Sequence, residues 1–553
     1  MYWVRGRTNM FDQTSIKRQH LKMKKYDVAI SGCGPVGAML SLLLAKGGLK
    51  VLVIEKELKV FNKPRAIVLD SEAMRILQFC GVAHQLGDSI KPHPGTDYIG
   101  LDGQLIKVFD PQPPPFQLGW PATLTFIQPI LERLLRKRIN TQKNIHLLLG
   151  NELVDVSDAN KSVEIKVRDS SSKESKTFSA KYLIGCDGGN SVVRTAMNVG
   201  VEDLGVDEDW LVVDAYLIKE TKLPPKFIQY CWPSRPATFV LGPRNVRRWE
   251  IKILPGEDLK DFERKEKVME VLSNYVDVTA LKIWRTATYK HRVTSSKKWK
   301  INNIFIAGDS AHRTPPFLGQ GLCTGIRDVA NLSWKILHTE KFGLNDKILN
   351  TYEKERKPHA KVVIKHAKEF GKIIGELNLE RAKKRDAILR PQLISGKMET
   401  TRQKFIPDIK GNLLIQKSLK TKECRNGGTL FVQPRLRFPR GQEKLMDDVI
   451  PMSFLYISTG LNQQIWMDPY ETFWRKLGGI RIIIMKDAER KETTPKDIVI
   501  TKEVGKIFSD WSSKVSCEAV LVRPDRYVFS TIHNQEDINA AIKKLRTIFS
   551  QKH

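Results

Sequence analysis

The hydrophobic pattern near the start of the chain predicts a strand, a helix and a second strand in succession. Residues 26–30 and 51–54 are short apolar runs, which are typical of buried parallel strands. Residues 36–45 between them are apolar on almost every side, which favours a buried helix. Glycines stand at both junctions and permit sharp turns. We therefore expect a strand–helix–strand unit within a parallel sheet.

Two later segments follow a related plan. Residues 182–184 predict a strand that ends just before Asp187, and residues 302–307 (NNIFIA) predict another. The second of these strands leads into the loop GDSAHRTPPFLGQG, residues 308–321, and then into a predicted helix over residues 322–337. A loop that combines prolines and glycines between a strand and a helix is rigid, and such loops commonly position ligands.

The end of the chain predicts a separate α/β unit. Apolar runs that predict strands and an amphipathic stretch that predicts a helix alternate there, at residues 453–458, 481–486, 519–530 and 538–549. The Lys-rich residues 395–427 are expected to form a linker. Residues 1–23 are basic and show little periodicity, so we expect a disordered extension, with a targeting segment as the alternative.

The amino-acid composition says more about the possible functions of the chain than about its fold. The chain has 553 residues, enough for two or three domains, and no apolar run long enough for a transmembrane segment. Its net charge of +31 admits nucleic acid or an anionic membrane as partner, but no nucleic-acid-binding motif is present, so we favour a solvated Lys-rich surface. Seven scattered cysteines without a C-x-x-C pair predict neither a disulfide framework nor a metal site, and favour a cytoplasmic location.

The first glycine-rich turn has the form of a dinucleotide-binding motif. Gly32, Gly34 and Gly37 make G-x-G-x-x-G between the first predicted strand and the helix. The first glycine allows the tight turn, the second lets a pyrophosphate approach the backbone, and the third lets helix and strand pack closely. Glu55 ends the second strand, where a carboxylate can bind an adenosine ribose. This motif alone does not separate NAD from FAD.

Two further motifs make the pattern more specific. Asp187 and Gly188 begin D-G-x-x-S-x-x-R, which alone could be a turn with a helix cap, and Asp309 begins the rigid loop. The three motifs, in this order and at these distances, resemble the class A flavoprotein monooxygenases. These are single-component aromatic hydroxylases with a glutathione-reductase-like FAD fold.

The resemblance implies a set of FAD contacts. Asp309 would bind the ribityl hydroxyls of the flavin, although a capping or loop-stabilising acid is the simpler interpretation of that residue alone. Pro315 and Pro316 would fix the loop beside the flavin ring, and the backbone of Gly319, Gln320 and Gly321 would face its N1/C2=O edge. Arg65 and Gln128 stand where the family has further FAD contacts.

Longer segments narrow the resemblance. Residues 229–257 and 288–317 are similar to the hydroxylases of 3-(3-hydroxyphenyl)propionate and 3-hydroxycinnamate, and FVQPRLRF, LMDDVIPMSFLYIS and VLVRPDRYVFST are similar to the thioredoxin-like tail of that group. The similarity covers roughly residues 24–550. The tail lacks C-x-x-C, so packing or dimerisation is a more plausible role for it than disulfide exchange.

The resemblance implies an α/β fold: a glutathione-reductase-like FAD-binding Rossmann domain with an inserted mixed β-sheet for substrate, and a C-terminal thioredoxin-like domain. The FAD-binding parts are expected at about residues 24–90, 120–200 and 291–345. The substrate sheet is expected at about residues 91–119 and 201–290, a helical part at 346–394, and the thioredoxin-like domain at 428–553.

The implied reaction is hydroxylation of a phenolic ring at the position ortho to its hydroxyl, with FAD, NADH or NADPH, and O2, through a flavin C4a-hydroperoxide. It requires an apolar pocket between the FAD domain and the middle sheet. If the substrate carries a carboxylate, an arginine is the expected anchor, with Arg235 and Arg244 as candidates. No catalytic side chain is assigned, His312 included, and no metal is expected.

One departure from the family pattern affects the expected flavin contacts. Leu322 and Cys323 stand where relatives usually have Met-Asn, close to the expected flavin. Two alternatives stay open: a related hydroxylase or epoxidase of a quinone precursor or polycyclic substrate, and a flavin- or NAD(P)H-binding protein without turnover.

Overall fold

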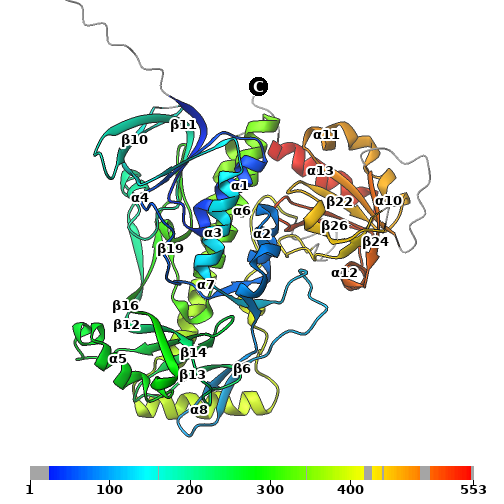
Figure 1. The fold of residues 1–553 in the computed structure, drawn as a ribbon. Helices are drawn as coiled ribbons and strands as arrows, with labels where there is room; N and C mark the ends of the chain where they lie inside the picture. Colours follow the sequence, from blue (N-terminus) through cyan, green and yellow to red (C-terminus); the bar gives the residue numbers. More distant parts are fainter. Residues whose placement is uncertain are drawn as a thin grey trace, which may run out of the picture.

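The computed structural model describes residues 24–159, 161–343, 346–415, 426–438, 441–485 and 498–549. The expected N-terminal extension, residues 1–23, and residues 416–425 of the expected linker lie outside this part of the chain. Three sheets dominate the described residues, and helices lie against each of them (Figure 1).

The first sheet contains the predicted strand–helix–strand unit. Its central strands run parallel, in the order β18 (Ile304–Ile306), β11 (Ser175–Gly185), β1 (Lys25–Ser31), β2 (Val51–Glu55) and β8 (Ile145–Leu149). The strands predicted at residues 26–30, 51–54, 182–184 and 302–307 are thereby confirmed. Outer strands complete the sheet: β17 (Lys300–Ile301), β9 (Asn151–Asp158) and β10 (Val163–Asp169).

Helices cover this sheet because its central strands are apolar on both faces. Helix α1 (Pro35–Lys46) is buried along most of its length, between the sheet and α3 (Gln128–Asn140) and α6 (Gly321–Phe342). The helix predicted at residues 322–337 is therefore confirmed, and it runs one turn further. Helix α7 (Thr351–Ile374) packs on α6 and extends toward the second sheet, where α8 (Leu379–Ile394) follows.

The second sheet is mixed and forms the other wall of the functional region. Its strand order is β19-β16-β12-β15-β14-β13-β5-β6, and all its pairs are antiparallel except β13 with β5. The strands are β5 (Thr96–Ile99), β6 (Leu105–Phe109), β12 (Val201–Leu217), β13 (Phe227–Tyr230), β14 (Ala237–Leu241), β15 (Val246–Lys252), β16 (Leu281–Ser296) and β19 (His312–Arg313). The long strands β12 and β16 connect this sheet to the first (Figure 1).

A short sheet has the strand order β3-β7-β4, with β3 (Val68–Asp70), β7 (Thr123–Phe126) and β4 (Ile90–Pro92). Helix α2 (Ser71–Cys80) follows β3 and contacts it. Helix α4 (Val192–Ala196) packs on β9 and β11 of the first sheet, and α5 (Lys265–Leu272) belongs to the hydrophobic core of the second.

The third sheet contains the C-terminal elements, drawn in yellow to red in Figure 1. Its strand order is β21-β20-β24-β23-β22-β25-β26, with β22, β23 and β24 parallel. The strands are β20 (Arg435–Arg437), β21 (Glu443–Leu445), β22 (Leu455–Ser458), β23 (Ile480–Met485), β24 (Ile498–Val504), β25 (Ala519–Val522) and β26 (Val528–Ile532). The helices are α9 (Met446–Val449), α10 (Asn462–Ile465), α11 (Glu471–Lys476), α12 (Ile507–Lys514) and α13 (Gln535–Phe549). The apolar run at residues 519–530 is two strands rather than one, because a turn at residues 523–527 divides it.

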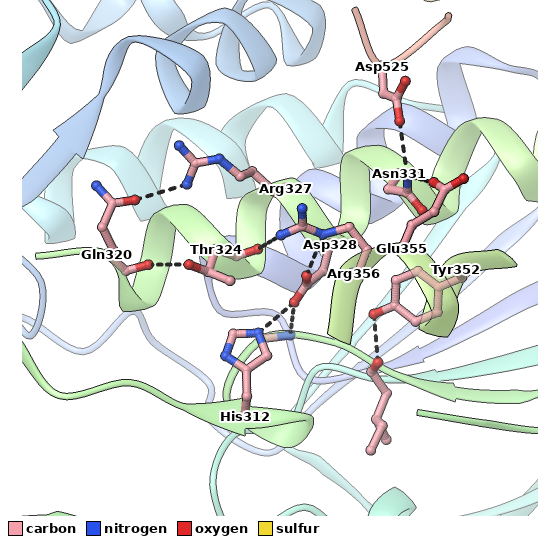
Figure 2. Close-up of polar contacts among 12 residues, drawn as sticks. His312, Gln320, Thr324, Arg327, Asp328, Asn331, Tyr352, Glu355, Arg356 and Asp525 are labelled. Carbon is pink, nitrogen blue, oxygen red and sulfur yellow. Dashed lines mark hydrogen bonds and ion pairs between the residues drawn. The ribbon is translucent and has the colours of Figure 1, made fainter. Parts of the chain in front are cut away.

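That turn joins the C-terminal unit to the first sheet's helices through buried charges. Arg523 contacts Glu355 at 2.9 Å and Asp525 at 2.6 Å, and Lys335 contacts Glu355 at 2.8 Å. The side-chain nitrogen of Asn331 in α6 donates to Glu355 at 2.8 Å and to Asp525 at 3.0 Å (Figure 2). All four charged side chains are almost completely buried. Among the described helices, none is both long and apolar enough to cross a membrane.

Candidate cofactor and substrate site

The glycine turn after β1 is packed too tightly for any side chain at two of its three glycines. A Cβ at Gly32, where φ is +97°, would lie 2.4 Å from the Cys186 carbonyl oxygen, and a Cβ at Gly37 would lie 2.1 Å from the Gly32 carbonyl oxygen. A Cβ at Gly34 would meet nothing within 4 Å. The N-terminus of α1 therefore opens onto free space at Gly34, which suits a pyrophosphate.

Glu55 supports this turn from the end of β2. Its carboxylate accepts hydrogen bonds from the backbone N–H of Cys33 at 2.7 Å and of Glu57 at 2.9 Å. Each bond occupies a different oxygen, so each oxygen keeps a lone pair for a ligand hydroxyl. The side chain can therefore hold the turn and a ribose together.

Asp187 is bound within the protein. Its carboxylate accepts hydrogen bonds from the backbone N–H of Val192 and from the Ser310 hydroxyl, both at 2.9 Å. Ser191 caps α4 by accepting from the backbone N–H of Arg194 at 3.0 Å. Asp187 thus ties the second motif to the rigid loop, whereas the backbone of Gly188, with φ of +82°, lines the cavity.

Asp309 shows the opposite arrangement. Its side chain faces the cavity, and no residue in the described part of the chain donates a hydrogen bond to its carboxylate. Although the Asp309 side chain is exposed toward the cavity, the protein around it desolvates the carboxylate and raises its pKa, and His312, Arg313 and Arg65 oppose the shift. A carboxylate left without donors beside an open space fits a ligand that carries hydroxyl groups, as the ribityl chain of FAD does.

A buried network holds the loop that carries Asp309. The Asp328 carboxylate contacts Nε2 of His312 at 2.8 Å, accepts from Nε of Arg356 at 3.0 Å, and accepts from the backbone N–H of Gly308 at 3.2 Å (Figure 2). The His312 ring also stacks on Trp299. These contacts make His312 a positioning residue for the loop. Sequence reasoning missed Asp328 and Arg356, since polar residues on a helix give no sign of their partners.

Gln128 and Arg65 meet as expected, but the glutamine acts on the backbone. The Gln128 side-chain oxygen accepts from the backbone N–H of Arg65 at 3.0 Å and of Ala66 at 2.6 Å. Both predicted residues line the cavity. Gln128 therefore fixes the chain segment that presents the Arg65 side chain.

The end of the rigid loop is only partly directed at the cavity. Pro316, Gly319 and Gly321 line it, with Gly319 at φ +60°, whereas the neighbouring Pro315 does not. Gln320 is buried, and its side chain accepts a hydrogen bond from Arg327 at 3.0 Å, away from the cavity (Figure 2). A contact between Gln320 and a cofactor is thus limited to the backbone.

Leu322 and Cys323, which depart from the family pattern, lie in different surroundings. Leu322 lines the cavity, while the Cys323 thiol is buried and lies 3.9 Å from the Val68 carbonyl oxygen. Burial also raises the pKa of the Cys323 thiol well above its usual range. Of the two residues expected close to the flavin, Leu322 thus borders the cavity, and Cys323 lies in the core behind it.

The cavity itself measures about 430 Å³ and lies between the glycine turn and the second sheet. Tyr98, Phe109, Phe227, Val240 and Phe317 supply apolar surface, and Gln229, Thr238, Glu250, His291 and Arg402 supply polar groups. Burial lowers the pKa of His291 to about 4, so its imidazole is neutral at pH 7.

The two arginines chosen from sequence as carboxylate anchors are not at the cavity. Arg235 pairs with Glu257 at 2.7 Å, and Arg244 pairs with Asp88 at 2.8 Å on the protein surface. Both guanidinium groups already have carboxylate partners, so the expectation was wrong for both. The arginines that line the cavity are Arg65, Arg248 and Arg402, and the last of these lies in the expected linker.

A parallel sheet with this glycine turn, a donor-free carboxylate and a second sheet that closes the cavity define a dinucleotide-binding protein with room for a further ligand. Residues 25–367 match the model of the FAD binding domain family, and residues 428–548 match the HcaD C-terminal domain. The chain belongs to the FAD binding domain family.

Comparison with characterised relatives gives the same class. The chain is 29% identical to the 3-(3-hydroxy-phenyl)propionate/3-hydroxycinnamic acid hydroxylase of Comamonas testosteroni, over 94% of this chain and 96% of that protein. It is 28% identical to the enzyme of the same name from Escherichia coli, over 95% and 94% of the two chains. Family and relatives together identify a flavin monooxygenase, which is an oxidoreductase that binds FAD.

Solved structures share the fold. The flavin-dependent monooxygenase PieE, solved with FAD and substrate, superposes with a TM-score of 0.76 at 17% identity, over 96% of this chain and 99% of that chain. Aklavinone-11 hydroxylase, solved with FAD and aklavinone, gives a TM-score of 0.73 at 18% identity, over 95% and 99%. These two structures establish the α/β architecture, and their ligands belong to those proteins.

Proposed function

We propose that this protein hydroxylates a small phenolic acid of the 3-(3-hydroxyphenyl)propionate type, using NADH or NADPH and O2. The balanced reaction converts the phenol, O2, NAD(P)H and a proton into the catechol, NAD(P)⁺ and water. One observation carries the proposal: a single cavity joins the glycine turn and Asp309 to an aromatic wall of the second sheet. A flavin and an aromatic ring can therefore share one cavity.

The residues around the cavity fit FAD. Gly34 leaves room at the α1 N-terminus, Glu55 keeps free lone pairs, and no described residue donates a hydrogen bond to the Asp309 carboxylate. Arg65 and the Gly319–Gly321 backbone would complete the contacts. When bound, FAD supplies the redox chemistry by accepting a hydride and activating O2.

The chain's own residues would bind and orient the substrate. Tyr98, Phe227 and Phe317 supply apolar surface that excludes water, which limits release of H2O2 without hydroxylation. The buried Nε2 of His291 has no hydrogen-bond partner in the described structure. The neutral imidazole can form a hydrogen bond through this nitrogen with the hydroxyl of a phenol.

The size of the cavity favours a single-ring substrate. Ligand sites range over roughly 300–1,000 Å³, so a cavity of about 430 Å³ lies at the small end, and the flavin ring takes part of it. A polycyclic substrate would require the second sheet to move. Two alternatives predict other results in a turnover assay: an enzyme with a polycyclic substrate, and a protein that binds flavin without turnover.

The C-terminal unit is proposed to be a thioredoxin-like domain with a packing role. Its order β23-β22-β25-β26, with one parallel and two antiparallel pairs, supports that architecture. Cys517 is the one cysteine among its described residues, and burial raises the pKa of its thiol to about 12. Thiol–disulfide chemistry is thus disfavoured, whereas the buried contacts of Arg523 support a role in packing.

Oxidation of NADH and NADPH by the FAD-loaded protein tests the proposal, with and without 3-(3-hydroxyphenyl)propionate. The expected result is stimulated oxidation with one catechol per NAD(P)H. Stimulated oxidation that yields H2O2 alone would reject this substrate class, and no stimulation with any phenolic acid would favour the protein without turnover.

A further inference from the structure

Arg402 is a cationic group of the cavity without a carboxylate partner. It begins a 3-10 helix, η7 (Arg402–Phe405), in the expected linker and lines the cavity. Its Nη2 donates to the Leu318 carbonyl oxygen at 2.5 Å, while its Nε is shielded from solvent and has no hydrogen-bond partner among the described residues. No carboxylate in the described structure lies within ion-pair distance of it.

The other arginines of the cavity are in different situations. Arg248 donates two hydrogen bonds to Asp214, at 2.7 and 3.1 Å, so its charge is balanced. Arg65 is exposed, lies over the Phe61 ring, and acts electrostatically on Asp309 at the cofactor end. Asp70 is the carboxylate that acts electrostatically on Arg402, but Asp70 already forms an ion pair with Arg327 at 2.5 Å.

The free energy of a desolvated, unbalanced charge points to a ligand. Burial lowers the pKa of the Arg402 guanidinium, which shows that its environment disfavours the cation. A buried charge is costly unless it is paired and hydrogen-bonded. A guanidinium offers two parallel donors that match a carboxylate, so an anion entering the cavity would remove this cost.

The position of Arg402 places it beside the reacting region. Its Nη2 lies 2.8 Å from where a Cβ of Gly319 would stand, so it touches the end of the rigid loop. It also acts electrostatically on the buried Tyr98 and His93, which belong to the second-sheet side. Arg402 thus lies where the loop expected to face the flavin meets the wall expected to hold the substrate.

We propose that Arg402 binds the carboxylate of the aromatic substrate and thereby selects phenols that carry an acidic side chain. This inference rests on the proposed function and specifies one residue of its substrate site. It assigns a binding role to a segment that the sequence pattern marks only as a linker.

The test compares one acid with its uncharged amide. Binding of 3-(3-hydroxyphenyl)propionate and 3-(3-hydroxyphenyl)propionamide to FAD-loaded protein is followed by the change in flavin absorbance, without NAD(P)H. Arg402→Met should weaken binding of the acid by roughly 30-fold or more and of the amide by less than about threefold. Arg402→Lys should recover part of the acid affinity because it keeps the charge without the fork. Arg244→Met, at the surface arginine paired with Asp88, is the matched control and should bind both ligands as the wild type does.

Several results would overturn the assignment. Equal losses for acid and amide, a changed flavin midpoint potential, or loss of FAD from Arg402→Met would indicate a structural or cofactor role. Equal affinity of the wild type for acid and amide would also refute it, even if Arg402→Met failed to fold.

The outcomes separate this inference from the proposed function. Arg402-dependent binding of the acid without hydroxylation would support the anchor and refute the enzyme activity. Hydroxylation of both ligands with equal KM would support the activity and refute the anchor.

Discussion

Asp309 and Asp187 stand in two neighbouring motifs, and the structure predicts opposite effects from removing each carboxylate. Asp309 has no hydrogen-bond donor in the described protein, whereas Asp187 accepts from the Val192 backbone and the Ser310 hydroxyl. Asp309→Ala should therefore leave the apoprotein as stable as the wild type, or slightly more stable. Asp187→Ala should cost about 2–3 kcal/mol in the free energy of unfolding, at about 1 kcal/mol or more for each bond.

FAD affinity should respond to Asp309 much more specifically. Two charge-assisted hydrogen bonds to ribityl hydroxyls are worth roughly 1.5–3 kcal/mol each, so Asp309→Ala should weaken FAD binding roughly 100-fold or more. Titration of apoprotein with FAD gives the affinity, and urea unfolding of the same apoprotein gives the stability. Unchanged FAD affinity in Asp309→Ala, or a large loss of its apoprotein stability, would refute the reasoning.

The pH dependence follows from the raised pKa of Asp309. The folded apoprotein holds that proton to a higher pH than the unfolded chain does, because desolvation by the surrounding protein raises the pKa. This contribution to stability is complete below the unfolded pKa and is lost as pH rises through the folded pKa. Asp309→Ala should remove that part of the pH profile of apoprotein unfolding.

Three further predictions follow from other contacts. Gly37→Ala should give protein that is poorly folded and free of FAD, because the new Cβ would lie 2.1 Å from a backbone oxygen. Gly34→Ala should fold but bind FAD weakly, because its Cβ enters the space expected to hold the pyrophosphate. Flavin content and thermal unfolding distinguish the two variants. Glu355→Gln should lower the free energy of unfolding by about 3–5 kcal/mol, because the buried Lys335 loses its carboxylate partner and Arg523 keeps only Asp525. Glu380→Gln at an exposed pair should change it by less than about 0.5 kcal/mol; equal effects in chemical denaturation would contradict this. His291 has a pKa lowered to about 4, so its contribution to stability is present above pH 6.5 and lost as pH falls toward 4; His291→Leu should flatten that window of the unfolding profile, and an unchanged profile would refute the assignment.

Local patterns in the sequence were sufficient to predict the glycine turn and four of the eight strands of the first sheet, namely β1, β2, β11 and β18. The pattern consists of apolar strands, an apolar helix and glycines at fixed spacing between them. The backbone packs so closely at this turn that a Cβ at Gly32 or Gly37 would overlap a carbonyl oxygen, so only glycine fits there. The resemblance to a known family supplied the class and the expected cofactor. The same patterns correctly predicted β22, β23 and α13 of the C-terminal unit. They joined β25 and β26 into one run, although Pro524 and Asp525 in the dividing turn are residues typical of turns.

Side-chain partnerships were beyond the sequence because they join residues far apart in the chain. Arg235 and Arg244 stand in the connections between β13, β14 and β15, but their carboxylate partners can be seen only in three dimensions. The network of Asp328, and the absence of a carboxylate partner for Arg402 among the described residues, could not be predicted for the same reason. Polar residues of a predicted helix or linker carry no signal for what they face.

Isotope labelling tests the central claim most directly. FAD-loaded protein is supplied with NADH or NADPH, 3-(3-hydroxyphenyl)propionate and ¹⁸O2 in ordinary water, and the aromatic product is analysed by mass spectrometry. The account predicts a catechol that carries one ¹⁸O atom on its ring, and no label when the ¹⁸O is supplied as water. An unlabelled product, or consumption of O2 with H2O2 as the sole product for every phenolic acid tried, would contradict it.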